Sequence, residues 1–137
     1  MEIYLVRHTS VDVPAGYAYG QTDVPLRSSF EDEAEVVKKT LSGHTFDKVL
    51  SSPLTRCVRL ANYCGYPNAE KEDRIKEISF GEWEMKSWDE LSSDPRSEAW
   101  FNDWINVPAP SGESLQDQYN RVSRFLDEIR ESGLQKV

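Results

Sequence analysis

Arg7 and His8 are the first residues of the chain whose side chains could do chemistry together. The apolar run before them, residues 3–6, is rich in β-forming side chains and is typical of a strand buried on both faces of a parallel sheet. Ligands bind outside the carboxyl ends of such strands. A guanidinium offers a fixed fork of donors to phosphate or carboxylate, and an imidazole titrates near neutrality. The pair therefore indicates an anionic substrate with a nucleophile or base, although an isolated Arg-His pair is more often a solvated loop start.

Arg56 follows a second expected strand. Residues 46–50 have the character of a strand, and the Ser-Ser-Pro sequence at residues 51–53 predicts the start of a helix, with serine as N-cap and proline in the first helical position. Arg56 would lie in the first turn of this helix, where backbone N–H groups and the helix dipole favour phosphate. Parallel strands end at one sheet edge, so Arg56 could face Arg7 and His8 across a phosphoryl group.

Three glutamates are candidate proton donors: Glu77, Glu82 and Glu84. Glu77 follows a charged stretch, residues 70–76, and charged runs are usually solvated surface. A positioned carboxyl group can protonate a leaving oxygen and afterwards take a proton from water. The residues alone leave the choice among the three glutamates open.

The elements that would position these side chains alternate between strand and helix. The glycines and prolines of residues 9–27 predict a long loop, and loops of this length are usually functional. Apolar residues recur at helical spacing over residues 29–41, 53–64 and 114–131. Alternating strands and helices predict an α/β fold, a three-layer sandwich with a mostly parallel central sheet flanked by helices.

The composition limits the partners of the chain. A net charge of −8 and a pI near 4.8 argue against nucleic acid and acidic membrane surfaces. No apolar run is long enough to span a membrane and no signal peptide is recognised, so we expect a cytoplasmic protein. Cys57 and Cys64 would lie about 10 Å apart on one helix, too far for a disulfide. Both thiols are expected to be buried, and the chain has too few other cysteines and histidines for a zinc site.

Four tryptophans, Trp83, Trp88, Trp100 and Trp104, are concentrated in one stretch of the chain. Trp100 and Trp104 would share one helix face, so the cluster could form the core of a short helical segment. It could equally cap a pocket and contact an aromatic leaving group. Both interpretations stay open.

Four spaced motifs resemble the histidine phosphatase superfamily, also called the phosphoglycerate mutase-like family, and together they cover essentially the whole chain. They are Arg7-His8-Thr9, Gly20-x-x-Asp23-x-Pro25-Leu26, Phe46-Asp47 followed by Ser51-Ser52-Pro53-Leu54-x-Arg56, and Glu77-x-x-Phe80-Gly81-x-Trp83-Glu84. Within the superfamily, residues 83–91 and 111–115 are most similar to the α-ribazole phosphatases of cobalamin nucleotide-loop assembly.

This resemblance implies a role for each candidate. His8 would be the phosphorylated nucleophile and Glu77 the proton donor. Arg7 and Arg56 would hold the phosphoryl oxygens. The remaining substrate-binding residues would be Thr9 and Gly20. No metal ion or cofactor is implied.

We therefore predict a phosphomonoester hydrolase that works through a phosphohistidine on a small phosphorylated substrate, with α-ribazole 5'-phosphate as the favoured one. The main alternative is a non-catalytic domain that binds phosphorylated ligands through Arg7 and Arg56. A broad-specificity phosphatase and a phosphoglycerate mutase-like enzyme are further alternatives within the superfamily.

The family pattern also places another buried strand beyond Val137, ending in a second histidine that binds the phosphoryl group. Neither His8 nor His44 can be that residue. We therefore expect residues 1–137 to be a single domain truncated at its C-terminus. A partner chain that supplies the strand, as in a homo-oligomer, and a domain that has lost catalysis are the alternatives.

Overall fold

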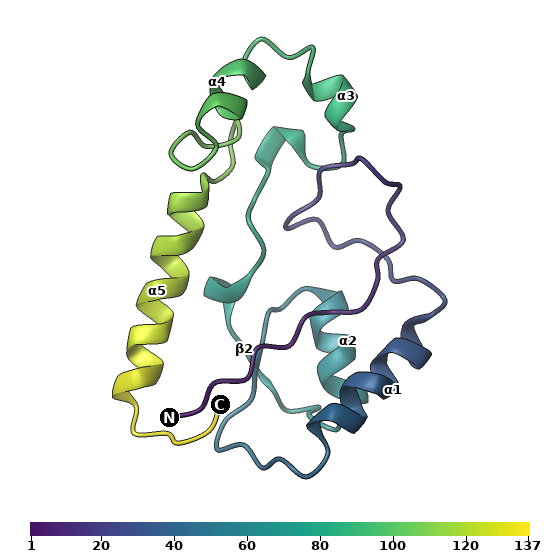
Figure 1. The fold of residues 1–137 in the computed structure, drawn as a ribbon, viewed down its shortest axis with the longest axis vertical. Coiled ribbons are helices and arrows are strands. Elements are labelled where there is room, and N and C mark those ends of the chain that lie inside the picture. Colours follow the sequence, from purple (N-terminus) through teal and green to yellow (C-terminus); the bar gives the residue numbers. More distant parts are fainter. The chain divides into compact units, whose positions relative to one another are not determined.

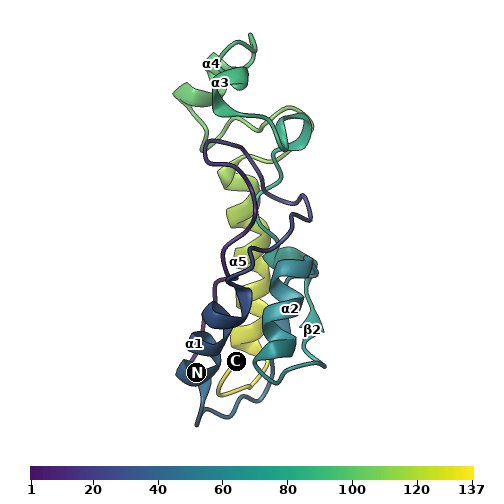
Figure 2. The ribbon, with the colours of Figure 1, turned by 90° about the vertical axis from the view of Figure 1, so that its right-hand side faces the viewer.

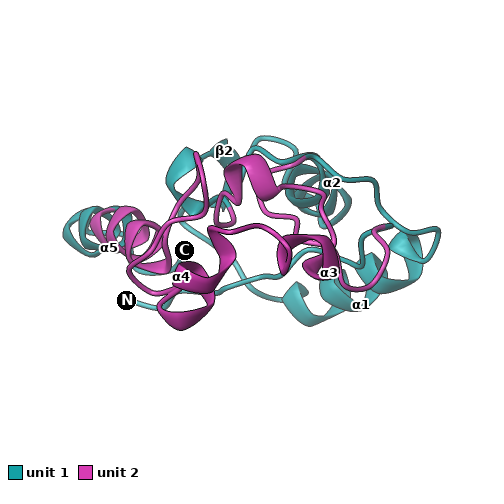
Figure 3. Cartoon of the chain, turned by 90° about the horizontal axis from the view of Figure 1, so that it is seen from above, with its two compact units in different colours: residues 1–12, 23–76, 125–137 teal, residues 13–22, 77–124 magenta.

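The computed structural model describes residues 1–137 and combines helices with a small parallel sheet, so the predicted α/β class is confirmed. The chain divides into two compact units (Figure 3). Unit 1 comprises residues 1–12, 23–76 and 125–137, and unit 2 comprises residues 13–22 and 77–124.

Two helices and the sheet are among the regular elements of unit 1. Helix α1 spans Phe30–Leu41 and helix α2 spans Thr55–Tyr63, and the two lie side by side (Figure 1 and Figure 2). Both were predicted, because their apolar residues recur at helical spacing. Their shared core is built from Phe30, Ala34 and Leu60.

The sheet is smaller than the predicted central sheet. Strand β1, Leu50–Ser51, pairs in parallel with strand β2, Glu70–Lys71, and a 3-10 helix, η1, follows at Asp73–Ile75. The predicted strand over residues 46–50 is thus reduced to its last residue and the one after it. Strand β2 was not predicted, because its charged side chains lack the alternation of a half-buried strand.

The predicted strand over residues 3–6 is wrong. No regular strand forms there, and Leu5 is 89% exposed and Val6 49% exposed. The backbone pairs on one side only, where Glu2 and Tyr4 donate to the carbonyl oxygens of Gln135 and Val137. A strand buried on both faces needs paired neighbours and covering elements, and residues 5 and 6 have neither in this structure.

Unit 2 is held by aromatic side chains. Its regular elements are η2 at Gly81–Trp83, α3 at Trp88–Leu91, α4 at Ser97–Asn102 and the first part of α5, which spans Leu115–Glu131. Trp83 is buried with Ala18, Leu91 and Ala109, and Phe80, Trp88 and Trp100 pack around them. The core-packing interpretation is confirmed for these three tryptophans.

Two residues of unit 2 depart from the predicted pattern. Trp104 lies beyond the end of α4 and is 47% exposed, so it does not share a helix face with Trp100. Tyr119 follows the helical spacing of residues 114–131 but is 65% exposed, so it does not lie on the buried side of α5. The prediction for Trp104 assumed one helix through residue 104, but α4 ends at Asn102.

Cys57 and Cys64 form no disulfide and are half-buried, whereas full burial was expected. Desolvation raises the pKa of the Cys64 thiol. No helix in the structure combines the length and apolar character required to cross a bilayer.

Gly20 is a site where a side chain cannot be added. A Cβ atom there would overlap the carbonyl oxygen of Ile78. We expect Gly20→Ala to lower the free energy of unfolding by about 3 kcal/mol, measured by urea denaturation. Gly16→Ala is the matched control, because Gly16 has a positive φ but open space around it, and should cost only about 1 kcal/mol. Equal losses would show that the overlap at Gly20 is relieved by a small backbone shift.

Candidate active site

Helix α2 presents Arg56 from its first turn, and Asp23 fixes where that turn begins. The Asp23 carboxylate accepts hydrogen bonds from the Thr55 backbone N–H at 2.9 Å and from the Thr55 hydroxyl at 2.6 Å. The predicted cap was a serine with Pro53 as the first helical residue, but the helix starts two residues later, and Leu54 in the N-cap position has no capping side chain. A loop carboxylate therefore does the work of the N-cap.

The Arg56 side chain is 1% exposed, which is rare for arginine. It lies next to a helix N-terminus, and the preceding Ser51 and Ser52 are buried too. An arginine in the first turn of a helix is suited to bind phosphate. Arg7, by contrast, is exposed.

The His8 ring is oriented by the backbone of the next residue. Its Nδ1 lies 2.7 Å from the carbonyl oxygen of Thr9. Because a carbonyl oxygen can only accept a hydrogen bond, Nδ1 must carry the proton, and the lone pair is left on Nε2. This is the orientation that nucleophilic attack by Nε2 requires.

The segment after His8 is tied to helix α1. The backbone N–H and the hydroxyl of Ser10 donate to one oxygen of Glu33, at 3.1 and 2.8 Å, and hydrogen bonds from Ser29 and Ser10 hold the pKa of Glu33 below its usual value. Thr9 is buried, and its hydroxyl has no hydrogen-bond partner within the chain. Buried hydroxyl groups normally find a partner, so this one suits a polar ligand.

Glu82 and Glu84 are engaged elsewhere. Glu84 accepts the backbone N–H groups of Gly20 and Gln21 at 2.8 and 2.7 Å, and Glu82 pairs with Arg96 at the surface at 2.8 Å. Both carboxylates therefore already have hydrogen-bond partners at other places in the chain. Glu77 as the proton donor stays a prediction. The amide of Gly20 is occupied by Glu84, so the structure gives this glycine a packing role, and its contact with substrate stays a prediction.

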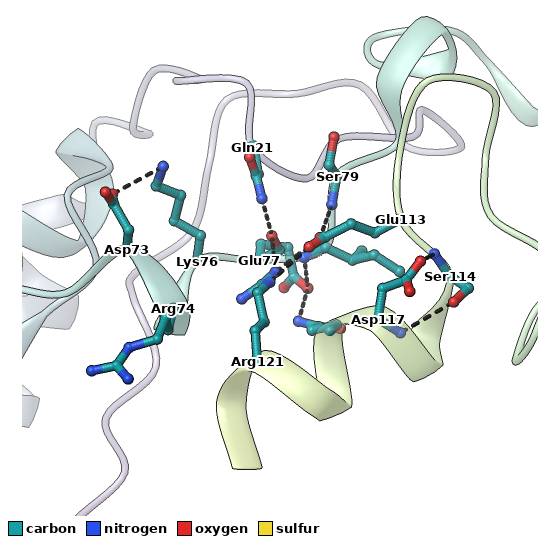
Figure 4. Close-up of polar contacts among 12 residues, drawn as sticks. Gln21, Asp73, Arg74, Lys76, Glu77, Ser79, Glu113, Ser114, Asp117 and Arg121 are labelled. Atoms are coloured by element: carbon teal, nitrogen blue, oxygen red, sulfur yellow. Dashed lines mark hydrogen bonds and ion pairs between the residues drawn. The ribbon is translucent and has the colours of Figure 1, made fainter. Parts of the chain in front are cut away.

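Glu77 belongs to a polar network of unit 2 that the sequence analysis missed (Figure 4). The Glu113 carboxylate accepts two hydrogen bonds from the Arg121 guanidinium, at 2.8 and 3.0 Å, and a third from the Ser79 backbone N–H at 2.9 Å. Arg121 also donates to the carbonyl oxygen of Glu77 at 2.9 Å. The eight-residue spacing of Glu113 and Arg121 in sequence is not a recognised helical pair, so it gave no signal.

The predicted site residues are thus distributed over both units. Four of them, the residues expected to attack or to bind the phosphoryl group, belong to unit 1: Arg7, His8, Thr9 and Arg56. Glu77 and Gly20 belong to unit 2. The pairing of Glu77 with His8 stays a prediction.

Comparison with known proteins gives one family over nearly the whole chain. A model of the histidine phosphatase superfamily (branch 1) matches residues 3–137. The phosphoserine phosphatase 1 of Hydrogenobacter thermophilus is 33% identical over 138 residues, which cover 95% of this chain and 64% of that protein. The adenosylcobalamin/alpha-ribazole phosphatase of Escherichia coli is 30% identical over 138 residues, which cover 96% of this chain and 68% of that protein.

The fold agrees with this match. The crystal structure of the alpha-ribazole phosphatase from Shigella flexneri superimposes with a TM-score of 0.84 at 26% sequence identity, covering 99% of this chain and 71% of that one. The chain therefore spans about two thirds of the length of the proteins it resembles, 64% and 68% of the two curated relatives.

The Glu113–Arg121 pair should make stability depend on pH. Burial alone would raise the pKa of Glu113, but hydrogen bonds from Arg121 and Ser79 outweigh it and hold this pKa below 4.5. The stabilisation is then fully present above pH 4.5 and is lost as the pH falls through the lower value in the folded state. We expect Glu113→Gln to lower the free energy of unfolding by about 2 kcal/mol at pH 7, with a gap that narrows toward pH 3.

Urea denaturation at several pH values measures this gap. Glu98→Gln is the control, because Glu98 is an exposed residue of α4. A gap for Glu113→Gln that stays constant between pH 7 and pH 3 would contradict a role for its charge.

Proposed function

Because the chain belongs to the histidine phosphatase superfamily (branch 1), we propose that it hydrolyses phosphomonoesters through a phosphohistidine formed on His8. The observation that carries this proposal is the 2.7 Å contact between His8 Nδ1 and the Thr9 carbonyl oxygen. It leaves the lone pair of the ring on Nε2, the nitrogen that would attack phosphorus.

The phosphoryl group would be bound by cationic and hydroxyl groups of unit 1. Charge spreads over the equatorial oxygens of a transferring phosphoryl group, and fixed donors stabilise that charge best. Arg56 is buried and held at the start of α2, so it is pre-oriented, whereas the exposed Arg7 can adjust to the substrate. The buried hydroxyl of Thr9 supplies a further donor.

Glu77 completes the proposed reaction. As His8 Nε2 bonds to phosphorus, the ester P–O bond breaks and the leaving oxygen takes the proton of the Glu77 carboxyl group. A water molecule then attacks the phosphohistidine, Glu77 accepts its proton, and the N–P bond breaks to release phosphate. The proposed steps use no metal ion or cofactor.

We propose α-ribazole 5'-phosphate as the substrate. The names of the Escherichia coli and Shigella flexneri relatives support it, and so does the similarity of residues 83–91 and 111–115. Phe101 and Trp104 are exposed in unit 2 and could contact a flat leaving group. The relative from Hydrogenobacter thermophilus is named a phosphoserine phosphatase, which makes phosphoserine the second candidate. Cysteines that form no disulfide suit a reducing compartment, and we propose the cytoplasm.

Phosphate release from 4-nitrophenyl phosphate tests the mechanism. We expect turnover by the parent chain to persist in EDTA and to fall by at least about a thousandfold in His8→Ala, because the nucleophile is lost. Turnover that survives in His8→Ala, or that EDTA abolishes, would refute the phosphohistidine route. No turnover by the folded parent chain, together with phosphate binding by His8→Ala, would instead identify a domain that only binds phosphorylated ligands.

The substrate is tested by comparing kcat/KM for α-ribazole 5'-phosphate and phosphoserine under the same conditions. We expect at least about a tenfold preference for α-ribazole 5'-phosphate, equivalent to about 1.4 kcal/mol of transition-state binding. A preference for phosphoserine would assign the chain to the other substrate, and equal values would indicate broad specificity.

A further inference from the structure

We propose that Gln118 and Arg121, two residues of one face of α5, position Glu77 so that its Oε2 delivers the proton to the leaving group. The inference rests on the proposed function, because it concerns the proposed acid. Gln118 and Arg121 act through Glu77, so they are positioning residues. All three belong to unit 2.

The side chain of Glu77 is held through one oxygen only. Its Oε1 accepts the side-chain amide of Gln118 at 3.2 Å and the backbone N–H of Ile78 at 2.8 Å. Both donors are N–H groups, so the lone pairs of Oε1 accept these two hydrogen bonds. Oε1 is therefore not the oxygen that carries the carboxyl proton. Oε2 makes no hydrogen bond within the chain. A transferable proton on Glu77 therefore lies on Oε2.

The backbone of Glu77 is held as well. Its carbonyl oxygen accepts Nη2 of Arg121 at 2.9 Å and the side-chain amide of Gln21 at 3.1 Å (Figure 4). Arg121 cannot rotate freely, because its guanidinium donates two hydrogen bonds to the Glu113 carboxylate. The side chains of Arg121 and Glu113 are only 13% and 22% exposed.

The two holding residues come from one rigid element. Positions 118 and 121 are three apart, so they lie on the same face of a helix, and α5 is 17 residues long. An exposed glutamate with three rotatable bonds would otherwise sample several rotamers. Proton transfer requires a fixed donor direction, and α5 supplies it by holding the side chain through Gln118 and the backbone through Arg121.

A leaving-group comparison tests this role. 4-Nitrophenolate leaves readily without a proton, whereas an alkoxide needs one. We expect Gln118→Leu and Arg121→Met to lower kcat/KM for ribose 5-phosphate by about tenfold, and for 4-nitrophenyl phosphate by less than about twofold. Equal losses on both substrates would overturn the proposal, because a general structural defect affects every substrate alike.

Matched controls lie on the same helix. Gln116 donates a hydrogen bond to Asn120, one turn along the helix, and Arg124 is exposed. Gln116→Leu and Arg124→Met should therefore leave kcat/KM for both substrates unchanged. Circular dichroism establishes that each variant folds. Gln118 is only half-buried at the helix surface, so Gln118→Leu decides the matter if Arg121→Met does not fold.

A second measurement needs no turnover. Nuclear magnetic resonance couplings report whether the Glu77 side chain occupies one rotamer. We expect one rotamer in the parent chain and in the two controls, and averaged couplings in Gln118→Leu. Averaged couplings in the parent chain would overturn the positioning role. If the parent chain turns over no phosphate ester, the proposed function fails, and this measurement still decides whether Gln118 and Arg121 hold Glu77.

Discussion

Carboxylates that accept backbone N–H groups hold the irregular parts of this chain together. Asp23 caps helix α2 from a distant loop, Glu33 ties the segment after His8 to α1, and Glu84 fixes the turn at Gly20. Only four residues lie in paired strands, so most loop amides must find acceptors outside a sheet. Hydrogen bonds to a charged acceptor are about twice as strong as neutral ones. Some of the acidic side chains behind the net charge of −8 therefore have a structural role.

Carboxylates that accept backbone N–H groups also support each part of the candidate site. In unit 1 the loop carboxylate of Asp23 sets where α2 begins and so where the Arg56 side chain leaves the backbone. In unit 2 the Glu113 carboxylate accepts hydrogen bonds from the Ser79 backbone and from the guanidinium of Arg121. Arg121 in turn holds Glu77. Catalytic side chains on loops need such support, because a loop alone does not keep a side chain within the narrow range of directions that chemistry requires.

The features that depend only on residues close together in sequence were predicted correctly. Helix α1 and helix α5 were found within one residue of their ends from apolar spacing, and the motifs around His8 and Arg56 gave the family. The strand predicted from the apolar run before Arg7 was wrong, because a preference for β structure does not show whether a partner strand lies alongside. The hydrogen bond from Arg121 to Glu77 could not be predicted, because it forms only where a helix face meets a loop that is distant in sequence.

All four tryptophans lie in unit 2, while unit 1 carries tyrosine and phenylalanine as its aromatic residues. Trp83 is buried, and the rings of Trp88 and Trp100 stack with centroids 5.6 Å apart. Indole emission therefore reports on unit 2 alone, whereas the far-ultraviolet signal comes from the helices of both units. Unfolding curves followed by these two signals coincide if the units melt as one cooperative body and separate if each melts by itself.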